Sequence, residues 1–151
     1  MNVGKRYNKN DIEKAAFLSK VMANRKNYSS ASKLINENDG GASDYAEYII
    51  EHELNHVKQN YLNAAAKGGW GGEIENRAKK WSKEWIKAVE SETWSPSDYA
   101  NAIRDISVRE KEWLAETYLL FKHKPELIKS DKVTALMNDF DKLLNDMSNA
   151  R

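Results

Sequence analysis

The chain has 151 residues, a formal net charge of +1 and 40% hydrophobic residues. This combination predicts one folded domain spanning residues 1–151, and it argues against a disordered chain and against a nucleic-acid-binding protein. No cysteine is present, which excludes disulfides, thiolate metal sites and cysteine nucleophiles.

The first 41 residues divide into two parts. Residues 11–26 carry apolar side chains at helical spacing and predict a helix, whereas residues 27–41 are polar and rich in turn-forming residues. Any short strand of this protein is expected in that second segment. The N-terminal residues have no apolar stretch typical of a secretory signal, and no apolar run in the sequence is long enough to span a bilayer. We therefore expect a cytoplasmic protein with no membrane partner, with secretion by another route or as part of a larger protein left open.

The rest of the chain reads as four more helices. One is expected over residues 44–67, from an Asp-x-x-Glu capping box to a Gly-Gly stop, and a second over 73–90. Residues Ser95–Asp98 have the serine, proline and aspartate of a helix start, and no glycine or proline follows until residue 125. We therefore predict one continuous helix over residues 96–122, capped by Ser95, then a last helix over 130–146. The expected fold is mainly α, with about five helices and at most a small sheet.

The helix over residues 44–67 contains the sequence His-Glu-Leu-Asn-His at positions 52–56. Two histidines four positions apart lie on one helix face, so both imidazoles can reach a single Zn²⁺ ion. Glu53 projects about 100° around the helix from His52, where it can hold a zinc-bound water and act as general base. The motif predicts His52 and His56 as zinc ligands and Glu53 as the catalytic residue.

Two faces are predicted for this helix. The face expected to pack into the core carries Ala46, Ile50, Leu54, Val57, Tyr61 and Ala64. The roughly opposite face, expected to form a cleft wall, carries Tyr45, Ile49, His52, His56, Gln59 and Asn63.

A catalytic zinc site needs a third protein ligand, and the sequence offers several candidates. Glu75 works only if the preceding helix ends early, and Glu84 has tryptophan neighbours that suggest packing. Glu112 and Glu116 lie one turn apart in a later predicted helix, so one could bind zinc while the other orients a histidine. His123 is a further candidate, although a place at a helix C-terminus explains it equally simply.

A family resemblance bears on this choice. The segment from Glu112 to Tyr118, Glu-Trp-Leu-Ala-Glu-Thr-Tyr, followed by Pro125–Leu127, resembles a stretch of the anthrax-lethal-factor-like metallopeptidases. Related zincin domains occur in phage and mobile-element proteins. The resemblance covers residue 45 to about residue 144, and it implies a zincin-like domain of the gluzincin type, with Glu112 as third ligand.

The same family has a tyrosine shortly before the glutamate ligand that assists the oxyanion. Tyr99 resembles it, but it lies 13 positions before Glu112. In one continuous helix that separation is about 20 Å, which puts Tyr99 in doubt and leaves Tyr45 and Tyr48 as alternatives.

The leading functional hypothesis is therefore a zinc-dependent hydrolase, a metallopeptidase acting on protein or peptide substrates. The competing hypothesis is a non-catalytic helical binding or structural module from a phage or mobile element, with a vestigial or structural zinc site. Metal content and the effect of removing Glu53 would discriminate between them. The oligomeric state cannot be read from the sequence.

Overall fold

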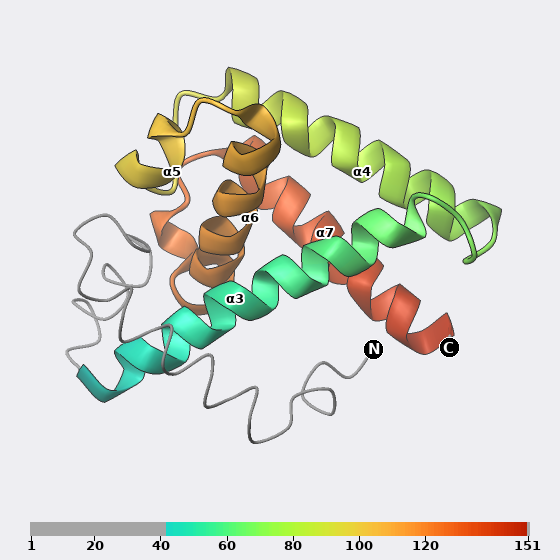
Figure 1. The fold of residues 1–151 in the computed structure, drawn as a ribbon, viewed down its shortest axis with the longest axis horizontal. Helices are drawn as coiled ribbons and strands as arrows, with labels where there is room; N and C mark the ends of the chain where they lie inside the picture. The colour runs from blue at the N-terminus through green and yellow to red at the C-terminus, as the bar shows by residue number, and fades with distance from the viewer. Residues whose placement is uncertain (1–41, 151) are drawn as a thin grey trace.

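The computed structural model describes residues 42–150, with side chains from residue 48 onward (Figure 1). This part of the chain contains five α-helices and one 3-10 turn, and no strand occurs within it. The elements are α3 (Ala42–Ala65), α4 (Gly72–Ser91), α5 (Asp98–Ala102), α6 (Ile106–His123), η2 (Pro125–Leu127) and α7 (Asp131–Ala150). The predicted mainly α fold is thus confirmed. The helix predicted over 11–26 and the turn-rich segment 27–41 lie outside the described residues.

Three of the predicted helices form close to their expected positions. Helices α3, α4 and α7 match the predictions over residues 44–67, 73–90 and 130–146 to within a few residues at each end. The turn between α3 and α4 has positive φ angles at Gly68, Gly69 and Gly71, and residues with a Cβ atom rarely adopt such angles. Between residues 42 and 150, no helix has both the length and the apolarity to cross a bilayer.

The prediction of one continuous helix over residues 96–122 was wrong. The chain forms the short helix α5, leaves the helical conformation at Ile103 and starts again as α6 at Ile106. Asp105 caps the new helix, because its carboxylate accepts from the backbone N–H and the hydroxyl of Ser107. Arg109 also donates to the Ile103 carbonyl and stabilises the bend. The chain thus passes from α5 to α6 without a glycine or proline, and the side chain of Asp105 caps the start of α6.

Aromatic side chains join α4, α6 and α7 into the core. Trp81 stacks on Trp85 at 5.6 Å and contacts Phe140 of α7 at 4.9 Å between ring centres. Both indole N–H groups donate to backbone carbonyls of neighbouring helices, that of Trp81 to Leu136 and that of Trp85 to Glu110. These bonds remove the cost of burying a polar donor, so the tryptophans fix the positions of α6 and α7 relative to α4.

Helix α3 lies diagonally across α6 in Figure 1, and it presents the opposite face from the one predicted. Its buried residues are Tyr48, Ile49, His52, Asn55, Gln59, Leu62 and Ala65. Of the predicted core face, residues 50, 54, 57 and 61 are half-buried and residue 64 is exposed. The prediction failed because it weighed hydrophobicity alone. Polar side chains of α3 can be buried here because α6 supplies their hydrogen-bond partners.

Candidate metal centre

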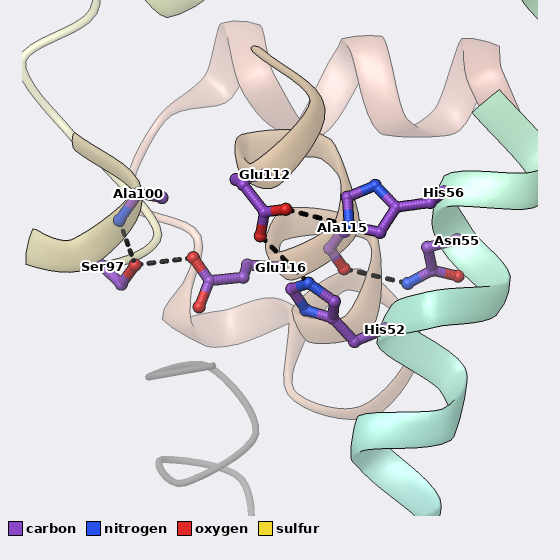
Figure 2. Close-up of polar contacts among 8 residues, drawn as sticks. All are labelled: His52, Asn55, His56, Ser97, Ala100, Glu112, Ala115 and Glu116. Carbon is purple, nitrogen blue, oxygen red and sulfur yellow. Dashed lines mark hydrogen bonds and ion pairs between the residues drawn. The ribbon is translucent and has the colours of Figure 1, made fainter. Parts of the chain in front are cut away.

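The α3–α6 crossing brings three metal-ligating side chains together. His52 and His56 stand one turn apart on α3, and Glu112 faces them from the second turn of α6 (Figure 2). The Nε2 atoms of His52 and His56 each lie 3.1 Å from a different oxygen of the Glu112 carboxylate. The two imidazole rings are 5.0 Å apart and nearly perpendicular. The predicted ligands therefore meet at one point, although they come from positions 60 residues apart.

The spacing of these donor atoms suits a metal ion. One ligand atom from each side chain lies within 4.8 Å of the other two. Ligands at about 2.0–2.1 Å around a tetrahedral ion are themselves separated by about 3.3 Å, so small side-chain shifts would bring all three atoms to a single ion. The group of His52, His56 and Glu112 could thus hold a metal ion. Two imidazoles and one carboxylate are a donor set that zinc and other divalent transition metals accept.

Electrostatics keep Glu112 in the ionised form that a metal requires. Burial alone would raise the pKa of Glu112, but hydrogen bonds and charge from His52 and His56 lower it to about 2. Burial likewise favours neutral His56, yet the hydrogen bond to Glu112 and the negative charges of Glu112 and Glu53 raise its pKa overall. Because an ionised carboxylate only accepts, both Nε2 atoms donate to it in this arrangement. Protons here occupy the positions that a metal would take.

Polar contacts on the helix faces that carry the metal group also hold α3 against α6. The Asn55 side chain donates to the Ala115 carbonyl at 2.9 Å, and the Gln59 amide donates to Glu110 at 2.7 Å (Figure 2 shows the first). Both α3 residues are almost fully buried. Burial raises the pKa of Glu110, against the opposing effect of the Gln59 hydrogen bond. These contacts fix the rotation of α3, and therefore the direction in which both histidines point.

Sequence reasoning placed Gln59 on the same face as both histidines, but it did not identify its partner Glu110, and it missed Asn55. A signal was present, because His52, Asn55, His56 and Gln59 recur at spacings of three and four and so share one side of a helix. A polar stripe of this kind indicates a buried polar interface when another helix offers matching groups.

Glu116 lies one turn after Glu112 and is fully buried. Its carboxylate accepts from the Ser97 hydroxyl at 2.6 Å, and the Ser97 oxygen also accepts from the Ala100 backbone N–H (Figure 2). Ser97 therefore caps α5 and ties it to α6 at the same time. A contact of Glu116 with a ligand histidine, suggested by the sequence, stays a prediction.

The other candidate ligands lie away from this group. Glu75 is in the first turn of α4, beside Gly68 at the far end of α3. Glu84 lines a separate cavity between α4 and α7. His123 pairs with Glu51 at 2.6 Å, in the last turn of α6. In the part of the chain that the structure describes, the group that can hold a metal contains none of these three.

Two predicted catalytic assignments remain untested. Glu53 is half-buried on α3, directly after His52. Tyr99 is half-buried on α5, a helix separate from α6. The doubt based on a 20 Å separation within one helix no longer applies, because the chain bends between Tyr99 and Glu112.

Comparisons with known proteins identify no relative. No family model matches the chain, and neither the curated proteins nor the solved structures gave a match. The case for a function therefore rests on the residues and their geometry.

Proposed function

We propose that this chain is a zinc-dependent hydrolase that cleaves peptide bonds, with His52, His56 and Glu112 as zinc ligands and Glu53 as general base. The observation that carries the proposal is the convergence of three donor atoms from α3 and α6 within 4.8 Å of one another. The His-Glu-x-x-His motif also supplies the carboxylate of Glu53, which directly follows His52 in the sequence.

Solvent access supports a catalytic rather than a structural site. His52 is 1% exposed, whereas His56 and Glu112 are 23% and 20% exposed, so the group opens to solvent on one side. Within residues 42–150 the group has three protein ligands. Catalytic zinc sites characteristically keep three protein ligands and leave a fourth position for water or substrate.

The residues of this chain have distinct parts in the proposed reaction. When bound, zinc lowers the pKa of a water toward about 7 and polarises the carbonyl of the peptide bond. Glu53 takes the proton of the attacking water and passes it to the leaving amine. His52 and His56 contribute neutral Nε2 atoms, and Glu112 contributes the negative charge that the ion needs. Asn55 and Gln59 hold these groups in place through α6.

The first experiment measures metal content. Protein purified without added metal is analysed by mass spectrometry, in the wild type and in His52→Ala and Glu112→Ala. We expect about one zinc per chain in the wild type and loss of zinc in both variants. Stoichiometric iron, or zinc retained in both variants, would contradict the assigned site.

The second experiment tests the reaction with Glu53→Gln, which keeps the size of the side chain but removes its basicity. We expect zinc to stay bound and cleavage of a fluorogenic peptide library to fall by about 10²-fold or more. Glu90→Gln, at an exposed position on α4, is the matched control and should cleave normally. Full activity of Glu53→Gln would exclude Glu53 as the base. Zinc with four protein ligands by X-ray absorption, and no cleavage, would indicate a structural site instead.

A further inference from the structure

A second polar cavity lies between α3, α6 and α7, and none of its residues belongs to the metal group. Its volume is about 220 Å³, and its walls include Lys58, Tyr61, Tyr118, Lys122, Asp141 and Leu144. Small-molecule sites usually measure about 300–1,000 Å³. This cavity therefore suits a compact ligand.

Two lysines from different helices meet above one aromatic ring in this cavity. The Nζ atoms of Lys58 and Lys122 lie 5.2 and 5.3 Å from the centre of the Tyr118 ring. Lys122 also pairs with Asp141 at 2.7 Å, and the Tyr118 hydroxyl donates to the same carboxylate. The carboxylate of Asp141 thus neutralises Lys122 and holds the hydroxyl of Tyr118.

The surroundings of Lys58 differ from those of Lys122. Among the side chains that the structure describes, from residue 48 to residue 150, no carboxylate oxygen lies within ion-pair distance of the Lys58 ammonium group, and the side chain is half-buried. Among the side chains that line the cavity, two lysines and one aspartate leave one net positive charge, which Glu51 outside the lining partly offsets at Lys58.

We propose that this cavity binds a compact monocarboxylate, with its carboxylate on Lys58 and its apolar body against Tyr61 and Leu144. One negative charge on the ligand balances the net positive charge of the cavity lining. A dianion would instead leave an excess of negative charge beside Asp141. A partly desolvated ammonium gains more from an anion than an exposed lysine does, because its interactions with water are already reduced. The proposal does not depend on the zinc site or on catalysis.

The test is a titration of the full chain with benzoate, followed by ¹H–¹⁵N NMR and calorimetry. Benzamide is the neutral analogue, and inorganic phosphate at pH 8 is the dianion. We expect saturable benzoate binding with a Kd in the millimolar range, with shifts clustered around residues 58, 118 and 144. Benzamide and phosphate should bind at least about tenfold more weakly. Equal binding of benzamide or of phosphate would overturn the proposal.

Lys58→Met keeps an unbranched, flexible side chain of nearly the same length and removes the charge. It should weaken benzoate binding by at least about tenfold, whereas Lys83→Met, at an exposed position on α4, should not change it. Unaltered binding by Lys58→Met would refute the assignment. A second measurement uses wild-type protein with ¹³C-methylated lysines, so it does not depend on folding of the variant. Saturating benzoate should shift the methyl signals of Lys58, and unchanged signals would also overturn the proposal.

Discussion

Replacing Glu112 by glutamine in metal-free protein should remove a pH-dependent contribution to stability. The Glu112 carboxylate accepts from both His52 and His56 at 3.1 Å. Glutamine has a similar shape but no charge, so it cannot stabilise a protonated His56. The variant therefore separates the charge of Glu112 from its packing.

The size and sign of the effect follow from the two perturbed groups. The pKa of Glu112 falls from 4.5 to about 2, which corresponds to about 3 kcal/mol at about 1.4 kcal/mol per pH unit. A depressed carboxylate pKa gives stability that is present above pH 4.5 and is lost as the pH falls toward 2. The raised pKa of His56 gives stability that is present below pH 6.5 and is lost as the pH rises through the folded-state value. Both describe the same ion pair, so they are not added, and the contribution is greatest between about pH 4.5 and 6.5.

The assay is urea unfolding of EDTA-treated protein from pH 3 to 8, followed by tryptophan fluorescence. The wild type should exceed Glu112→Gln by up to about 3 kcal/mol near pH 5.5, and the difference should shrink toward both ends of the range. Glu90→Gln, on the exposed face of α4, controls for a change in net charge. A difference that does not vary with pH, or that stays below about 0.5 kcal/mol as for an exposed pair, would show that Glu112 does not hold both histidines.

Three further predictions concern the same helices. Zinc binding should release at least one proton near pH 6 and fewer at pH 9, because the raised pKa of His56 makes protons compete with the metal; calorimetry in buffers of different ionisation enthalpy measures this. Asn55→Ala should lower the free energy of unfolding by about 1 kcal/mol in urea titrations, because the buried hydrogen bond from Asn55 to the Ala115 carbonyl is lost. Ser97→Ala should cost a similar amount by the same measurement, because one hydroxyl both caps α5 and donates to Glu116. An unfolding free energy unchanged by either substitution would contradict the importance of these bonds.

Local signals in the sequence predicted most of the helices. The end of α3 is followed by Gly68 and Gly69, and the Ser130 hydroxyl accepts from the Val133 backbone N–H at the start of α7. Signals of this kind act within a few residues of the chain. The break between α5 and α6 was missed because an aspartate cap inside a helix-forming stretch is hard to distinguish from an ordinary surface residue. Asp105 becomes decisive only through its bonds to Ser107.

The candidate site likewise has one part that local sequence signals predict and one part that depends on how the helices pack. His52, Glu53 and His56 lie within one helical turn, so their relative geometry follows from helix periodicity alone. The partner on α6 depends on how two helices cross, and the sequence left Glu75, Glu84, Glu116 and His123 open as alternatives to Glu112. Family resemblance rather than physical reasoning favoured Glu112, and the crossing of α3 and α6 then placed it opposite both histidines.

The inverted orientation of α3 also bears on how the metal site should be tested. Hydrophobicity favoured the face with Leu54 and Val57, but the buried face is the one on which His52, Asn55 and Gln59 meet polar partners on α6. The candidate metal ligands therefore belong to the same interface that holds the two helices together. Substituting a ligand will weaken the fold as well as any metal binding, so loss of activity in such a variant is ambiguous. Glu53 is half-buried and lies outside the set of fully buried polar residues at this interface, and for that reason the Glu53→Gln variant separates chemistry from folding more cleanly.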